Sequence, residues 1–178
     1  MEFVKRSKNP RYEYSMHRKL YNEFPSFVTR PLRLKGNKIH MKYYKNKSLK
    51  QYLSSRKSAP NVLSIVRKVK RMIDSIQRRF PLFRHNDLHI GNIIVESKGK
   101  LRFTDFELTR LQGRVPKIIP SFGVTNRHNP RYDFHCFLNS LRSFMIRTKR
   151  PVGILNKLLP PGYRGKNGKY VRNGRLTS

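Results

Sequence analysis

Three polar side chains in this sequence have the types and the spacing that transfer of a phosphoryl group requires. Asp87 and Asn92 lie in the segment 84–92, and Asp105 follows the next two apolar runs. In-line transfer of a γ-phosphoryl group needs a carboxylate that orients or deprotonates the attacking hydroxyl, and hard oxygen ligands that hold Mg²⁺. We therefore expect Asp87 to be catalytic, and Asn92 and Asp105 to be metal ligands.

Two short strands are predicted to position these side chains. Residues 93–96 and 101–104 are mostly apolar and flank a turn that contains Gly99. Asn92 directly precedes the first of these segments, and Asp105 directly follows the second. The sequence therefore predicts that the polar side chains lie on loops held by strands, which is where functional side chains are commonly found.

Two plainer interpretations of the same residues stay open. Asp and Asn favour turns between strands, although turn chemistry alone does not account for the joint spacing across two loops. His85 and His89 also flank Asp87, which is compatible with half of a zinc or di-metal hydrolase site. Such a site needs further ligands, and the remaining histidines form no convincing second cluster: His17, His40, His128 and His135. We interpret His85 instead as a buried residue that shapes the loop by hydrogen bonding.

Hydrophobic periodicity predicts the elements around these loops. Apolar side chains recur at helical spacing in 61–80, with basic side chains on the other face, so this is the clearest helix. The pair Gly36-Asn37 between two β-rich runs is a hairpin signal. Residues 107–131 show no period and contain several Pro and Gly residues, which favours a loop-rich segment. The predicted strands are 2–6, 27–34, 38–44, 93–96 and 101–104, and the predicted helices are 12–21, 61–80, 133–147 and 154–159.

Composition narrows the class of protein and its partners. The 178 residues are 37% hydrophobic, enough for one globular domain with a real core. The 41 Lys and Arg residues against 9 Asp and Glu residues give a formal net charge of +32, which favours nucleic acid, nucleotides, acidic proteins or anionic membrane surfaces as partners, without ranking them. The single cysteine, Cys136, excludes an internal disulfide and suggests an intracellular, reducing compartment. No segment has the roughly 20 apolar residues of a membrane span, so we expect a soluble protein.

The spacing of Asp87, Asn92 and Asp105, with the predicted hairpin between them, resembles the catalytic core of the protein-kinase-like superfamily. The resemblance implies that Lys5 is the lysine that contacts nucleotide phosphates and that Glu13 is its ion-pair partner. Either residue could also have a plainer role, Lys5 as a surface lysine and Glu13 as support for its helix.

The resemblance extends to the segments that surround the nucleotide in this family. Residues 41–44, with Met41 and Tyr43, look like the hinge strand whose backbone receives adenine, and 48–53 looks like the helix after it. Asp133 looks like the buried aspartate that accepts hydrogen bonds from the catalytic-loop backbone. The whole chain, including its end at 160–166, looks most similar to small kinase-like proteins of large DNA viruses of algae and protists, which would place it in the cytoplasm of a host cell or in a virion.

The fold that this resemblance implies is α+β, an abbreviated protein-kinase-like fold. We expect a domain at 1–150, in which a truncated N-lobe at 1–45 has a few antiparallel strands plus one helix, and a mainly helical C-lobe covers 46–150. A basic segment containing Pro and Gly follows at 151–178. The implied activity is transfer of phosphate from ATP, with Mg²⁺, to serine or threonine hydroxyls of a protein.

Departures from the family pattern keep two other functions open. Only four residues precede Lys5, so the glycine-rich loop and its two strands are missing, which suits a pseudokinase that binds nucleic acid or an acidic partner through its basic surface. His89 and Glu107 instead look like the small-molecule kinases of the choline and aminoglycoside type. Asn86 replaces the arginine of many regulated kinases, and without that guanidinium we expect no switching by phosphorylation.

Overall fold

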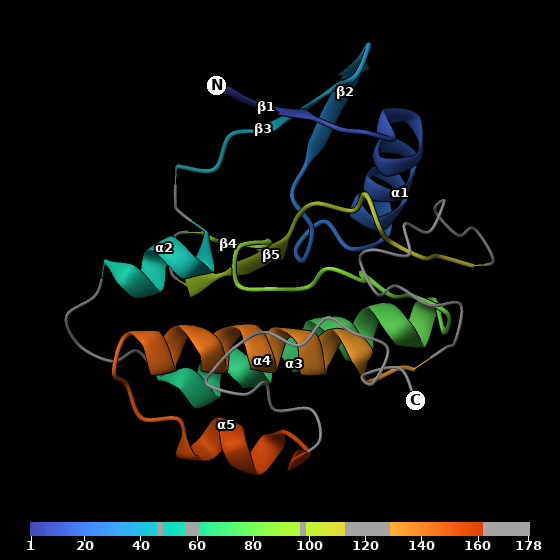
Figure 1. The fold of residues 1–178 in the computed structure, drawn as a ribbon. Helices are drawn as coiled ribbons and strands as arrows, with labels where there is room; N and C mark the ends of the chain where they lie inside the picture. Colours follow the sequence, from blue (N-terminus) through green and yellow to red (C-terminus); the bar gives the residue numbers. More distant parts are fainter. Residues whose placement is uncertain (46–47, 56–60, 97–98, 113–128, 162–178) are drawn as a thin grey trace.

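The computed structural model describes residues 1–45, 48–55, 61–96, 99–112 and 129–161. Within these ranges the chain is a mixed α+β structure with five helices and two small antiparallel sheets, so the expected α+β class is confirmed. Figure 1 shows one sheet and α1 (Pro10–Glu23) in the upper part, the helices α3 (Val62–Arg79), α4 (Tyr132–Arg147) and α5 (Gly153–Leu158) in the lower part, and the second sheet between them.

The upper sheet contains β1 (Glu2–Arg6), β2 (Pro31–Lys35) and β3 (Lys38–Lys42) in the order β1-β3-β2. The predicted hairpin turn joins β2 and β3, and Gly36 adopts φ 58 there, a conformation that glycine reaches without strain. The sequence prediction of a strand over 27–34 is wrong in its first half. Residues 27–29 pair instead with the second sheet, because the N–H of Thr29 donates to the carbonyl of Phe103 at 3.0 Å.

Helix α1 (Pro10–Glu23) packs against β2 and β3. Its proline at the first position costs no hydrogen bond, since that N–H has no partner inside a helix. The buried side chains of Met16 and Leu20 face the core. The helix is longer at both ends than the predicted 12–21, and its placement fixes Glu13 on a buried face.

The other four described helices are α2 (Leu49–Ser54), α3 (Val62–Arg79), α4 (Tyr132–Arg147) and α5 (Gly153–Leu158). The predicted apolar stripe of α3 is confirmed, and side chains such as Val69 and Ile76 are fully buried. The stripe of α4 packs against α3, and α5 packs against α4 through Leu155. The side chain of Asn61 caps α3 by accepting a 2.9 Å hydrogen bond from the N–H of Ser64.

The second sheet is the short hairpin β4 (Ile93–Val95) and β5 (Leu101–Phe103), both predicted from the sequence. Arg102 connects this hairpin to the upper part of the molecule. Its guanidinium donates to the carboxylate of Glu96 at 2.9 Å, to the carbonyl of Val28 at 3.0 Å, and to the carbonyl of Pro25. The hairpin is therefore tied to the segment that follows α1.

Parts of two sequence predictions lie outside the described residues, namely 113–128 of the loop-rich segment and 162–178 of the basic C-terminal segment. None of the described helices combines the length and the apolar character needed to cross a membrane.

Candidate active site

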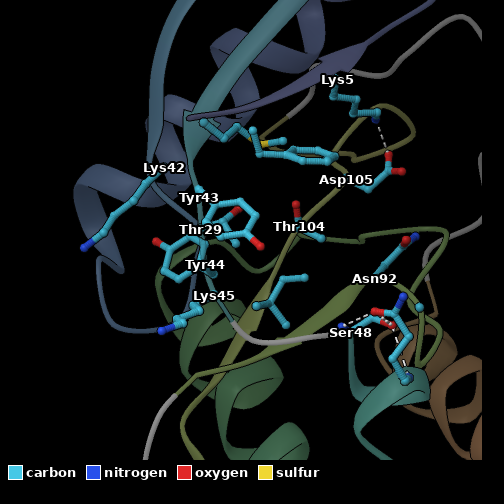
Figure 2. Close-up of a pocket in the computed structure, with 15 residues that line it drawn as sticks. Lys5, Thr29, Lys42, Tyr43, Tyr44, Lys45, Ser48, Asn92, Thr104 and Asp105 are labelled. Atoms are coloured by element: carbon cyan, nitrogen blue, oxygen red, sulfur yellow. Dashed lines mark hydrogen bonds and ion pairs between the residues drawn. The ribbon is translucent and has the colours of Figure 1, made fainter. Parts of the chain in front are cut away.

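The β4–β5 hairpin brings Asn92 and Asp105 to the same end of one small sheet. Ile93 pairs with Phe103, and the next residue of β5 continues the pairing, with the N–H of Thr104 donating to the carbonyl of Asn92 at 3.1 Å. Both polar side chains line a cavity of about 520 Å³. Figure 2 shows Asn92 and Asp105 on the same side of this cavity. The expectation that the hairpin places these two residues together is confirmed.

Lys5 joins Asp105 to Glu13 across the interior of the site. The ammonium nitrogen of Lys5 lies 2.6 Å from Oδ1 of Asp105, a contact that Figure 2 shows, and 2.7 Å from Oε1 of Glu13. Lys5 and Glu13 come from β1 and α1, so two elements of the upper part of the molecule meet the loop after β5 here. The plainer interpretation of Lys5 as a solvated surface lysine is wrong, because it is engaged by both carboxylates.

Burial and charge act in opposite directions on this ion pair. Burial by itself lowers the pKa of Lys5, but the carboxylates of Asp105 and Glu13 outweigh it and raise that pKa above the ordinary value. Burial raises the pKa of Glu13, and the ammonium of Lys5 offsets part of that rise. Lys5 is therefore a firmly charged group at the wall of the cavity.

Asp87 lies beside this cavity and is held there by Asn92. The side-chain nitrogen of Asn92 donates to the backbone oxygen of Asp87 at 2.9 Å and to its carboxylate at 3.3 Å. The same bonds direct the amide nitrogen of Asn92 toward Asp87 and leave its amide oxygen for another ligand. Asp87 is not among the described residues that line the cavity, but its link to Asn92 places it next to them.

His89 folds back over the loop and reaches the carboxylate of Asp87. The N–H of Gly91 donates to Nδ1 of His89 at 2.9 Å, and Nε2 of the same ring lies 3.7 Å from Oδ2 of Asp87. Because Nδ1 accepts a hydrogen bond, the proton of the neutral ring is on Nε2, which faces Asp87. A Cβ atom on Gly91 would lie 2.7 Å from Cε1 of His89, so a larger residue at position 91 would force the ring to move.

Asp133 anchors the loop that precedes Asp87, and it makes the backbone contacts that the resemblance implied. Its carboxylate accepts the backbone N–H of His85 at 2.7 Å and that of Asn86 at 2.9 Å. Asp133 is fully buried on α4, and burial raises its pKa, while the two amides favour the charged form. Asn86 has φ 64, a left-handed conformation that asparagine tolerates better than most residues.

Three aromatic rings connect the two loops to α1. The ring centroid of Phe106 lies 5.2 Å from that of His85 and 4.9 Å from that of His17. His85 is fully buried and its Nε2 is 3.0 Å from the carbonyl of Thr104, so the interpretation of His85 as a buried, hydrogen-bonded packing residue is confirmed. Burial lowers the pKa of His17 to about 4, which keeps this ring neutral at physiological pH.

The predicted hinge residues line the cavity, but one backbone donor is already used. Met41 is buried against the cavity, and Tyr43 is at its more exposed rim. The N–H of Tyr43 donates to the carbonyl of Met1 at 3.2 Å, so it is not free to bind a base. Within the described ranges the N–H of Tyr44, the next residue, has no hydrogen-bond partner and is the better candidate.

Glu107 has a structural role that the sequence did not reveal. Its Oε1 accepts the backbone N–H groups of Lys8 at 2.7 Å and of Asn9 at 3.3 Å, and the hydroxyl of Ser7 is 3.4 Å away. The carboxylate thereby accepts hydrogen bonds from N–H groups at the start of α1. Its negative charge also interacts favourably with the positive end of the helix dipole. It ties the loop after Asp105 to α1, and a glycine at this position could not do so.

Two groupings bear on metal binding. His85 is fully buried with its Nε2 3.0 Å from the carbonyl of Thr104, and the metal-ligand grouping found among the described residues contains no histidine, so the zinc-type interpretation is not supported. Among the described residues the carboxylates of Glu13, Asp105 and Glu107 have ligand atoms within 4.8 Å of one another, but the ammonium of Lys5 already contacts two of them. The oxygens of Asn92 and Asp105 at the cavity wall are hard donors of the kind Mg²⁺ prefers, so these residues fit the ion.

Comparison with known proteins adds no assignment, because no family model matches this sequence and no curated protein is significantly similar to it.

Proposed function

We propose that this chain is an ATP- and Mg²⁺-dependent phosphotransferase of the protein-kinase-like superfamily, with serine or threonine hydroxyls of a protein as acceptors. The observation that carries the proposal is the convergence of Lys5, Asp105 and Asn92 on one cavity, with Glu13 paired to Lys5 behind it and Asp87 beside it. These residues come from positions far apart in the sequence. A set of turn-forming residues without a common function has no reason to meet an ion-paired lysine in this way.

The proposed roles follow from charge and position. Lys5 binds the α- and β-phosphates of ATP, and Glu13 keeps its ammonium directed at the cavity. Asp87 accepts a hydrogen bond from the acceptor hydroxyl, aligns its oxygen with the γ-phosphorus and takes up its proton. Asp133 holds the loop that carries Asp87 by its two amide bonds. Catalysis by these groups is positioning and charge stabilisation, with no covalent enzyme intermediate.

Asn92 and Asp105 would hold Mg²⁺ through oxygen atoms, and the bound ion would supply positive charge to the phosphates. Asp105 now gives one carboxylate oxygen to Lys5 at 2.6 Å. When phosphate oxygens take over the ammonium of Lys5, that carboxylate oxygen becomes available as a ligand. Nucleotide binding and cation binding are therefore expected to be mutually dependent in this site.

Label transfer from radioactive ATP tests the proposal. The full chain is incubated with Mg²⁺ and a mixture of basic and acidic proteins, next to the isosteric variants Asp87→Asn and Asp105→Asn. Asp74→Asn is the matched control, because Asp74 lies on α3 in a partly exposed pair with Lys70. We expect the rate to fall by at least ~10²-fold in both site variants and to stay unchanged in the control. Equal transfer in all four proteins would refute the proposal.

A second candidate is a binding protein that does not turn over ATP and that uses its basic surface to hold a polyanion. The observation that favours it is the short contact between Lys5 and Asp105, because each of these residues then neutralises the charge of the other. This candidate predicts no label transfer to any acceptor, including choline and aminoglycosides, but salt-sensitive binding of a nucleic-acid duplex. Transfer to one of those small molecules would instead assign the chain to the small-molecule kinases.

A further inference from the structure

β1 is an edge strand that exposes one apolar side chain on each face of the sheet. The order β1-β3-β2 leaves one side of β1 without a neighbouring strand among the described residues. Phe3 is 51% exposed and Val4 is 45% exposed. Edge strands are ordinarily protected by a proline, a bulge, an exposed lysine or a covering element. β1 has no proline and no bulge, and its protection is confined to its short length and to the charges at its ends, with Lys5 turned inward to two carboxylates and Arg6 exposed.

Hydrogen bonds at the two ends of β1 show which backbone groups face outward. The N–H of Tyr43 donates to the carbonyl of Met1, and the N–H of Ser7 donates into the β2–β3 turn, so the odd-numbered residues pair inward with β3. Successive residues alternate in an antiparallel ladder. The N–H and C=O groups of the even-numbered residues, with Val4 at the centre, therefore point to the free edge.

The two faces of β1 differ in chemistry. Phe3 and Lys5 line the cavity and so share one face (Figure 2 shows Lys5). On the other face, Arg6 is opposite Lys38, which is opposite Lys35, and all three side chains are exposed. Like charges directly opposite one another destabilise a sheet. A carboxylate on a strand next to Arg6 would relieve this row of three cations.

We propose that β1 accepts, as a fourth strand, an extended segment of a partner protein in which acidic and small apolar residues alternate. Its backbone pairs with the even-numbered residues of β1, its apolar side chains cover Phe3, and its carboxylates lie beside Arg6. A second copy of the chain is the less suitable occupant, because a formal net charge of +32 on each molecule opposes association.

The added strand also lies at the rim of the cavity. Lys5 is on β1, so a strand on the outer edge of β1 shields the side of the cavity where Lys5 is placed. This shielding would strengthen ATP binding, and that consequence rests on the proposed function. The docking itself does not depend on it, since it needs only the free edge, the exposed apolar residues and the cationic row.

A short fluorescent peptide of alternating Glu and Val, with blocked ends, serves as the probe. Its affinity is measured for the wild-type chain, for Val4→Pro and for Val4→Thr. Proline at position 4 removes an outward N–H without breaking the pairing to β3, whereas threonine keeps the N–H and the β-branched shape. A peptide N-methylated at alternate amides keeps the charge but cannot pair as a strand. We expect Val4→Pro and the N-methylated peptide each to weaken binding by at least about tenfold, and Val4→Thr to bind as wild type.

Hydrogen exchange provides a second measurement that folding defects cannot mimic. In the complex, the amides of Val4 and Arg6 should become protected, whereas those of Phe3 and Lys5, already bonded to β3, should change little. Equal affinity for both peptides, or equal affinity of Val4→Pro and wild type, would reduce the effect to general charge attraction and overturn the proposal. Dimerisation of the chain that Val4→Pro abolishes would overturn it in favour of a second copy.

Binding of ATP with and without the peptide separates this proposal from the proposed function. Peptide binding to a chain that shows no ATP affinity would refute the phosphotransferase and leave the docking site in place. Loss of label transfer cannot therefore be mistaken for loss of docking.

Discussion

At the scale of single residues, the space for a side chain at position 91 is limited by a neighbouring ring. The backbone conformation of Gly91 is not what limits it. The imidazole of His89 occupies the space in which a side chain at position 91 would begin, with ring atoms 2.7 and 2.9 Å from an ideal Cβ. The same ring accepts the N–H of Gly91 and faces Asp87. The small residue and the imidazole therefore form one unit beside the candidate catalytic carboxylate.

Replacement of Gly91 by alanine should displace the ring of His89 and disturb Asp87. We expect Gly91→Ala to lower the free energy of unfolding by only about 1 kcal/mol, because the partly exposed imidazole can give way at the cost of a less favourable rotamer, and to reduce phosphate transfer. Gly153→Ala is the matched control, because nothing lies within 4 Å of a Cβ at that helical position and alanine favours a helix. Urea denaturation measures both variants, and a Gly91→Ala protein as stable as Gly153→Ala would contradict the packing argument.

His17 should make the fold sensitive to acid. Its buried ring has a pKa of about 4, whereas the unfolded chain has the ordinary value near 6.5. Between these two pH values the unfolded state binds a proton that the folded state does not, so stability falls as the pH drops through this window. The full penalty below the lower value is about 3 kcal/mol. The ring's Nε2 donates to the carbonyl of Thr29 and its Nδ1 has no partner among the described residues, so a buried second proton would be unsatisfied.

The variant His17→Gln tests this prediction, because glutamine keeps a donor for Thr29 but does not titrate. We expect the difference in unfolding free energy between pH 7 and pH 4 to be smaller in the variant than in the wild type. An identical pH dependence in the two proteins would show that other groups cause the acid sensitivity.

The spacing of Asp87, Asn92 and Asp105, together with the family resemblance, predicted which polar side chains would lie close together. Lys5, Glu13 and Asp105 meet as expected, and Asp133 accepts both loop amides. The sequence did not reveal that Glu107 anchors the start of α1. The carboxylate and the N–H groups that it accepts are about a hundred residues apart, and those donors are backbone groups. No residue pattern reports which backbone N–H a distant carboxylate will meet.

At the scale of elements, the hydrophobic periodicity predicted whether a segment is a helix or a strand better than it predicted which strands pair. The helix at 61–80 was predicted almost to its ends, since a buried stripe with a basic opposite face allows only one interpretation. The run 27–34 has strand composition throughout, but its first residues pair with β5 and only its last residues join β2. Which neighbour a strand-forming segment pairs with depends on tertiary packing, and alternation within the segment does not contain that information.

The cap of α3 allows a prediction at this scale. Asn61 satisfies one free N–H of the first turn, that of Ser64, at 2.9 Å. Asn61→Ala should cost about 1 kcal/mol of stability because that donor then loses its partner. Asn61→Asp keeps the acceptor and adds a favourable charge at the helix start, so it should be at least as stable as wild type. Thermal unfolding monitored by circular dichroism distinguishes the two variants. An equal loss of stability in both would show that the acceptor oxygen at position 61 does not stabilise the helix.

At the scale of the whole molecule, the ion pairs of the described residues use few of the cations. The pairs include Arg33 with Glu2, Lys70 with Asp74, and Arg79 with Glu23, all with exposed partners that contribute little to stability. With 41 basic and 9 acidic residues, most positive charges have no acidic side chain to pair with. The candidate site therefore lies in a molecule whose overall field attracts any polyanion.

Binding of a nucleic-acid duplex tests whether this field is concentrated on α3. Arg67, Arg71 and Arg78 lie on its exposed face, opposite the buried stripe, and replacing all three by glutamine removes three charges from one surface. If phosphates bind there, the slope of log affinity against log salt should become less steep by about 0.9 per lost contact. The control removes three exposed charges elsewhere: Arg11, Arg18 and Lys35. Fluorescence anisotropy at several salt concentrations gives both slopes. A larger change in the variant of α3 locates the contact on that helix, whereas equal changes mean that the attraction comes from the total charge and that no particular face is the binding surface.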